Sequence, residues 1–391
     1  MKKKLIALAV AGAMTAPMAA LADVKISGQL QSQVVSYSGD GGPLKGVYLS
    51  DGGNVANGNS GGSWGALHIN ASEDLGGGMK ALASYGFNIS TQDGDGKNIG
   101  TRQAFVGLSG DFGTVLAGKM NHPYKTATIS WDPFVATFMQ ARDNGGMGGG
   151  VLHGAESSNA LAYANSFNGV RVVVAAIVDE DAQYAGEPGD ADERTGKTNG
   201  NHAYAFSVNM PVGPVEIALA HANLSKHTTS VNDDDEWNYG VADKSTATKL
   251  GVKYTAGDFS VAGQVEMLGQ GLSDRNGADV AENRGATSGN IYYLTGSYKM
   301  GANTISVSMG RTDKKLMGSG FDEDAAELYG AKNVDYMAIG LSHAFSSKTN
   351  AFVGYRTTRN VLVTGGSVDD GDRFATHERS NAIGAGLRVR F

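Results

Sequence analysis

Apolar and polar side chains alternate along many short segments of this chain, and that alternation restricts what it can fold into. In the segment 79–90, one face of an extended strand would carry Met79, Ala81, Ala83, Tyr85, Phe87 and Ile89. The same alternation runs through 204–210, 259–267 and 383–391. Successive side chains of a strand point to opposite faces, whereas a helix repeats every 3.6 residues. No convincing stretch with the helical period interrupts the pattern, so it predicts β-strands throughout.

The connections between these segments are alternately short and long. The seven short ones hold the Gly, Asn, Pro or Ser that tight turns require; they fall at 74–78, 110–113, 167–169, 211–214, 256–257, 300–302 and 346–348. The eight long ones are polar and acidic; they fall at 38–62, 91–100, 121–157, 180–199, 225–243, 271–287, 312–332 and 359–378. Seven short and eight long connections separate sixteen strands, with fourteen and eighteen as alternatives.

An all-β fold, a 16-stranded antiparallel transmembrane β-barrel, accounts for this arrangement. A soluble sandwich would need bulky residues on its inner face, but here the face opposite the apolar one carries Gly, Ala, Ser, Lys, Arg and Gln. Short periplasmic turns alternating with long external loops are typical of outer-membrane barrels, in which about ten residues tilted by about 40° span an apolar band of about 25 Å. A barrel of this size encloses water. The alternative is a secreted propeller or solenoid, for which no fixed-period repeat is found.

The first 22 residues have the pattern of a secretory signal peptide. A Met and three lysines precede the apolar run 5–13, and the small-x-small sequence 20–22 is typical of a cleavage site. We therefore predict a cleaved signal peptide at 1–22 and a barrel domain at 23–391. The alternative, an N-terminal membrane anchor, is disfavoured because the run is short and is followed by Pro17.

Composition excludes several other classes of protein. With no Cys, the chain is not a disulfide scaffold, an iron–sulfur protein or a Cys-ligated zinc domain. Loss of the three leader lysines takes the formal charge from −7 to −10, which argues against a nucleic-acid partner. The eight His residues show no H-E-x-x-H spacing, and we predict no cofactor or metal site. A barrel enzyme, phospholipase or protease, is a remote alternative.

Four segments carry recognisable motifs: 23–28 at the start of the first strand, 72–81 at a short turn, 102–115, and the closing strand that ends in Phe391. These segments resemble the Gram-negative general porins, and 102–115 is the most specific match. The resemblance implies a homotrimeric outer-membrane channel for passive diffusion of small hydrophilic solutes and ions, without enzymatic activity. It also implies contact with outer-membrane lipid and lipopolysaccharide, recognition of Phe391 by the assembly machinery, and a third long loop, 121–157, folded inward as the constriction.

The same resemblance nominates charged residues at that constriction. Arg102 matches an arginine of the family's basic wall, and it lies opposite in phase to Phe105. Lys119 ends the next strand, where the family often has a second basic residue, and Asp132 falls in the inward loop where the family places acidic side chains. Asp143 is a further acidic candidate. Opposed charges across a narrow gap set ion preference, whereas the alternative for each residue is a solvated loop or rim position.

Two departures from the family pattern bear on selectivity. Ala66 stands near the position of a frequent arginine, and Glu156 falls where another arginine would precede the Asn-x-x-x-Tyr stretch at 159–163. Loss of one cation and reversal of another weaken the basic wall. We therefore predict a channel that prefers cations or is weakly selective. A channel that prefers sugars, organic acids or amino acids is the alternative.

Overall fold

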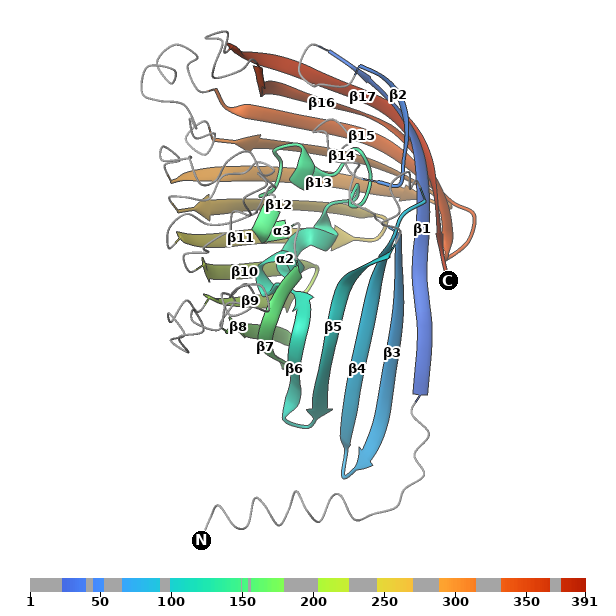
Figure 1. The fold of residues 1–391 in the computed structure, drawn as a ribbon. Coiled ribbons are helices and arrows are strands. Elements are labelled where there is room, and N and C mark those ends of the chain that lie inside the picture. Colours follow the sequence, from blue (N-terminus) through green and yellow to red (C-terminus); the bar gives the residue numbers. More distant parts are fainter. Residues whose placement is uncertain are drawn as a thin grey trace, which may run out of the picture.

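The computed structural model describes residues 23–39, 45–52, 65–91, 99–148, 150–153, 156–178, 203–224, 245–269, 288–313, 332–365 and 374–391. In these residues the chain forms one antiparallel sheet that curves round and closes on itself (Figure 1). The predicted 16-stranded barrel is confirmed, with one additional short strand.

The strands follow one another around the barrel in chain order. They are β1 (Asp23–Ser38), β2 (Gly46–Ser50), β3 (Gly65–Gly76), β4 (Met79–Ile89), β5 (Ile99–Gly110), β6 (Gly113–Asn121), β7 (Glu156–Phe167), β8 (Val170–Ile177), β9 (Ala203–Val212), β10 (Val215–Leu224), β11 (Ser245–Ala256), β12 (Phe259–Leu268), β13 (Gly289–Met300), β14 (Asn303–Thr312), β15 (Val334–Ala344), β16 (Thr349–Gly365) and β17 (Phe374–Arg390). Short helices follow β6: α2 (Pro123–Thr128), η2 (Ile129–Trp131), η3 (Ala141–Asp143) and α3 (Gly150–His153). In the described residues, no helix has the length and apolar character that crossing a membrane would require.

The first strand and the last strand close the barrel. One edge of β1 pairs with β17 and the other with β3, and the backbones of Gly28 and Phe391 exchange N–H···O bonds of 3.1 and 3.0 Å. Closure thus pairs both edges of β1, and unpaired strand edges are what hydrocarbon would not tolerate. The additional strand β2 lies within the connection predicted at 38–62. It pairs with the half of β1 that β3 does not reach. The alternating residues 46–50 form a strand there because that part of the β1 edge is not occupied by β3.

The alternation seen in the sequence sorts side chains between the two faces of the wall. Large apolar residues on the outward face are well exposed in the isolated chain; they include Tyr85, Val106, Leu108, Tyr204, Leu250, Met267, Leu294, Ile383 and Leu387. Many of the intervening inward positions carry small or polar residues, such as Ala218, Gln264 and Ser308, and some carry large ones that pack against the segment between β6 and β7. Every predicted short connection lies between paired neighbouring strands, as at Gly77 and Gly78 between β3 and β4. Hydrocarbon outside and polar groups inside are what a membrane barrel requires.

Candidate functional site

The segment between β6 and β7 folds into the barrel and lies along its inner wall. We call residues 122–153 the inner loop, of which the structure describes 122–148 and 150–153. Its apolar side chains pack against inward residues of β1, β13, β15, β16 and β17. This cluster comprises Phe134, Phe138, Met139, Ala141 and Met147 of the loop with Val35, Tyr37, Tyr293, Tyr336, Ala338, Phe352 and Ala382 of the wall. The loop backbone comes very close to the wall at Gly310, where a Cβ would overlap the backbone of Gly146.

Asp132 organises the inner loop from within. Its carboxylate accepts hydrogen bonds from the backbone N–H groups of Phe134 (3.0 Å) and Ala141 (2.8 Å), and from the Tyr293 hydroxyl of β13 (3.2 Å). Burial raises the pKa of Asp132 to about 6, against the lowering effect of these donors. We predicted that Asp132 would act on passing ions, but its side chain is almost fully buried. The reason is that Asp132-Pro133 makes a turn, and the carboxylate satisfies backbone donors there.

A buried polar group ties both arms of the loop to β11 and β12. The Lys249 Nζ donates to the Tyr124 carbonyl (2.9 Å) and the Thr128 hydroxyl (3.0 Å), and lies 2.6 Å from His153 Nε2. The neighbouring Glu266 accepts from the Tyr124 hydroxyl at 2.8 Å and from the Gly148 N–H at 3.1 Å. We call Lys249 and Glu266 with these loop partners the Lys249–Glu266 latch.

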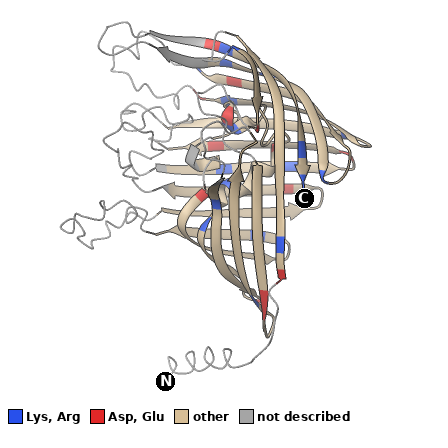
Figure 2. Cartoon of the chain, turned by 45° about the vertical axis from the view of Figure 1, so that its right-hand side comes forward, with Lys and Arg blue, Asp and Glu red and all other residues tan. Residues whose placement is uncertain are grey.

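A charged group lies where the inner loop meets the wall of β5 and β7. The Glu156 carboxylate is 3.7 Å from Nε of Arg102 and 3.3 Å from Nζ of Lys125 in α2. The side chains of Arg102 and Glu156 are 19% and 14% exposed, so this Glu156 cluster (Arg102, Lys125 and Glu156) is accessible to solvent in part. Figure 2 shows charged residues sparsely placed along the strands, with long uncharged stretches between them. The cluster therefore brings together charges of both signs from wall and loop.

Two further charged residues of the inner loop, Arg142 and Asp143, interact with the charges of the Glu156 cluster. Arg142 Nε is 3.8 Å from the Asp143 carboxylate, whose side chain is one quarter exposed. Burial lowers the pKa of Arg142, and the positive charge of Arg102 lowers it further. The carboxylates of Asp143 and Glu156 act in the opposite direction and raise it. Burial likewise lowers the pKa of Lys125 to about 8, although the Glu156 carboxylate raises it. Around the two carboxylates there are thus three cations, two of them from the loop.

Arg102 reaches the interior for a reason that the sequence prediction did not contain. Arg102 lies opposite in phase to Phe105, so simple alternation with an inward Arg102 would put Phe105 outside, but Phe105 pairs with the buried Ser84 and packs beside the inward Met120. A β-bulge makes Gln103 pair with Gly86 and Thr101 with Phe87, leaving Arg102 as the extra residue. Bulges of this kind redirect side chains. The guanidinium consequently reaches Glu156 and lies 3.4 Å from the Asn88 amide oxygen.

The last two sequence candidates, Ala66 and Lys119, lie on opposite faces of the wall. Ala66 is buried on the inner face and pairs with Asn88, the neighbour of Arg102. The structure does not bring Lys119 into the cluster. Lys119 on β6 pairs with Ala104 on β5, and Val106, two residues after Ala104, points outward. The Nζ of Lys119 donates to the Thr101 carbonyl at 3.1 Å. The pairing register therefore places Lys119 on the outer face.

The sequence prediction missed Lys125, Arg142 and both wall residues of the latch. Lys125 and Arg142 come from short helical turns without a periodic signal. Lys249 and Glu266 could have been suspected, because each is a charge on the polar face of a strand and the two are cross-strand partners. No group of three or more His, Asp or Glu suited to a metal ion occurs in the part of the chain that the structure describes.

Comparisons with known proteins agree with this architecture. A family model described as Gram-negative porin matches residues 7–361. The major outer membrane protein P.IB of Neisseria gonorrhoeae is 25% identical over 366 residues, which cover 90% of this chain and 92% of that protein.

Solved structures show the same fold at lower identity. An anion-selective porin from Comamonas acidovorans superposes with a TM-score of 0.65 at 20% identity, covering 95% of this chain and all of that one. The trimer form of OmpT from Vibrio cholerae gives 0.59 at 13% identity, covering 95% and 99%.

Proposed function

The chain belongs to the Gram-negative porin family, whose members are outer-membrane channels and not enzymes, and from this premise we propose that it conducts small hydrophilic solutes and ions by passive diffusion past a constriction formed by the loop 121–157. The observation that carries the proposal is the Glu156 cluster, in which a loop cation and a wall cation share one partly exposed carboxylate. Charges at such a gap act strongly on ions because water there screens them poorly.

We further propose that selectivity is weak. The sequence alone suggested a depleted basic wall, since Ala66 and Glu156 replace expected arginines. The loop supplies cations in their place, because Lys125 and Arg142 lie beside Glu156 and Asp143. Three cations around two carboxylates leave a small positive excess within a chain whose formal charge is −7. These opposing contributions support weak selectivity over a firm preference for cations.

Liposome swelling tests the channel function. Refolded mature protein should let uncharged sugars enter at rates that fall smoothly with molecular size and rise in proportion to their gradient. Planar-bilayer recordings should show ohmic conductance in KCl. Swelling that saturates with one solute would instead favour the substrate-preferring channel, and absence of conductance would contradict the proposal altogether.

The depressed pKa of Lys125 predicts pH-dependent selectivity. Lys125 carries its charge below about pH 8 and loses it above, so the fixed charge falls by one as pH rises through that value. The reversal potential in a KCl gradient should therefore move toward cations between pH 7 and 9. Lys125→Arg keeps the charge throughout this range and should reduce the drift. If the pH dependence of the reversal potential is the same in that variant, the charge of Lys125 does not act on the permeating ions.

We also propose that residues 1–22, which lie outside the described residues, are a cleaved signal peptide, and that the mature chain assembles as a homotrimer. The signal-peptide proposal is supported by the start of β1 at Asp23, the predicted mature N-terminus. The homotrimer proposal is supported by the Vibrio cholerae structure with this fold, which is a trimer form. Phe391 is exposed beside the start of β1, where the assembly machinery could contact it.

A further inference from the structure

A row of charged side chains crosses the outer face of the barrel near the ends of the strands that lead to the long loops. Tyr292, Arg311, Asp335, Arg359 and Arg379 are successive register partners on β13 to β17. Alternation places them on the same face as the outward apolar residues. The row faces away from the interior of the barrel and so lies apart from the path of the permeating ions. We call Arg311, Asp335, Arg359 and Arg379 the arginine row.

The row holds more positive charge than its own carboxylate can neutralise. Arg311 Nε donates to the Asp335 carboxylate at 2.6 Å, so this pair is satisfied. Arg359 and Arg379 are both exposed and directly opposite each other on β16 and β17. Across the residues that the structure describes, neither forms an ion pair with a carboxylate. Like charges directly opposite in a sheet are destabilising, and an anion between them would reverse that effect.

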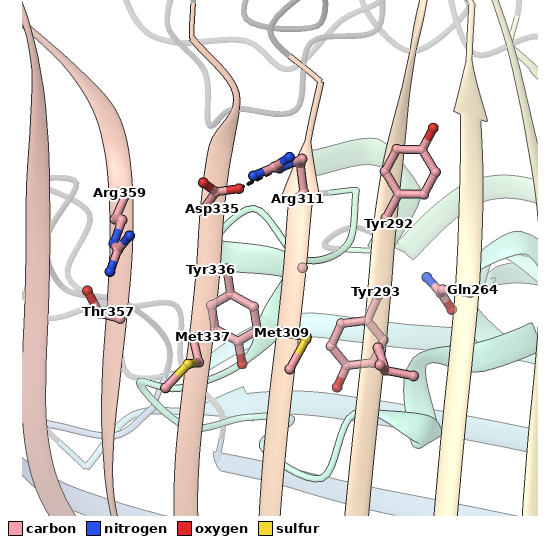
Figure 3. A pocket seen from close by; sticks show the side chains of 12 residues that line it. Gln264, Tyr292, Tyr293, Met309, Arg311, Asp335, Tyr336, Met337, Thr357 and Arg359 are labelled. Atoms are coloured by element: carbon pink, nitrogen blue, oxygen red, sulfur yellow. Dashed lines mark hydrogen bonds and ion pairs between the residues drawn. The ribbon is translucent and has the colours of Figure 1, made fainter.

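Apolar side chains lie on the membrane side of the row. Leu294, Met309 and Met337 are each two residues further along their strands from Tyr292, Arg311 and Asp335, in the direction of the short turns. These residues belong to a groove of about 590 Å³ that extends to Arg359. Figure 3 shows the Arg311–Asp335 pair above Met309 and Met337, with Tyr292 to one side and Arg359 to the other.

Charged side chains above apolar ones match the charged headgroup and apolar chains of a lipid molecule. Tyr292 lies level with the charged residues, and tyrosine is typical of the interface between hydrocarbon and headgroups. Arginine binds phosphate through paired, charge-assisted hydrogen bonds, while the apolar floor matches an acyl chain. A free phosphate ion would use the cations but gain nothing from the groove beneath them. The geometry points to the phosphate of an acylated lipid in the outer leaflet as the occupant of the arginine row.

Binding to lipid A in detergent micelles tests this assignment. We compare diphosphorylated lipid A, the same lipid with its phosphates removed, and inorganic phosphate as a competitor, all with EDTA present to exclude metal bridging. Wild-type protein should bind the phosphorylated lipid at least tenfold more tightly than the dephosphorylated one. Arg359→Gln/Arg379→Gln should lose at least tenfold in affinity, because two phosphate donors are removed.

The control variant is Arg171→Gln/Lys348→Gln, which removes two exposed cations at the short-turn end of the barrel. It should bind like wild type, and conductance should confirm that both variants are folded channels. Unchanged affinity of the Arg359/Arg379 variant, or equal binding of the dephosphorylated lipid, would overturn the proposal. Full competition by millimolar inorganic phosphate would assign the row to a soluble anion instead. Loss of the oligomer in that variant alone would assign it to a neighbouring subunit.

Discussion

Replacing Glu156 with glutamine should make the channel prefer anions. Glu156 is the only carboxylate of the Glu156 cluster, and its loss leaves the positive charges of Arg102 and Lys125 without a carboxylate between them. A unit charge a few ångströms from a permeating ion is worth about 1 to 4 kcal/mol, reduced by salt. We expect the anion-to-cation permeability ratio to rise about three- to tenfold, and further for Glu156→Arg. Reversal potentials in a KCl gradient measure this ratio.

The matched control is Glu73→Gln, which removes the same charge from an exposed position near a short turn on β3. It should leave the reversal potential within error of wild type. Measurements at 0.1 M and 1 M KCl add a second check, because screening should shrink the effect of Glu156→Gln at high salt. A folded, conducting Glu156→Gln channel with unaltered reversal potential would remove Glu156 from the constriction.

Most of the barrel could be predicted from the sequence because its physical determinants are local. Alternation fixes which residues face lipid, and turn residues fix where strands reverse, so the segment 79–90 and the turn at Gly77 and Gly78 are as expected. The strand β2 was missed because five alternating residues inside a long polar connection become a strand only when an open edge of β1 lies beside them.

The constriction was only partly predictable because it depends on features without a periodic signal. Arg102 faces inward through a bulge, and simple alternation from Phe105 reached the right face for the wrong reason. Asp132 looked like a channel acid but satisfies backbone donors of its own turn. Lys125 gains its place from the way α2 packs on the wall, which requires the three-dimensional path of the loop. Alternation alone therefore placed neither the strand charges Arg102 and Lys119 nor the charges of the loop.

Substituting Lys249 with methionine should release the inner loop from the wall. The Lys249 ammonium bonds to Tyr124 and Thr128 on one arm of the loop and contacts His153 on the other. Its removal also leaves the fully buried Glu266 without the neighbouring cation. Breaking a buried charge pair from one side typically costs about 3–5 kcal/mol. We expect faster hydrogen exchange in 122–153 and a larger, noisier single-channel conductance.

Lys253→Met is the matched control, since Lys253 is four residues further along β11 on the same face and pairs with Ala262, away from the latch partners. It should leave exchange in 122–153 unchanged. The double variant Lys249→Met/Glu266→Gln removes both charges, so no buried charge is left alone and the loss of protection should be smaller than in Lys249→Met. If the single and double variants lose equal protection, the charges do not act as a pair, and the packing of Phe134, Phe138 and Met139 alone holds the loop. Because the loop carries Lys125 and Arg142, its release should also shift the reversal potential toward cations, which links the latch to the field at the constriction.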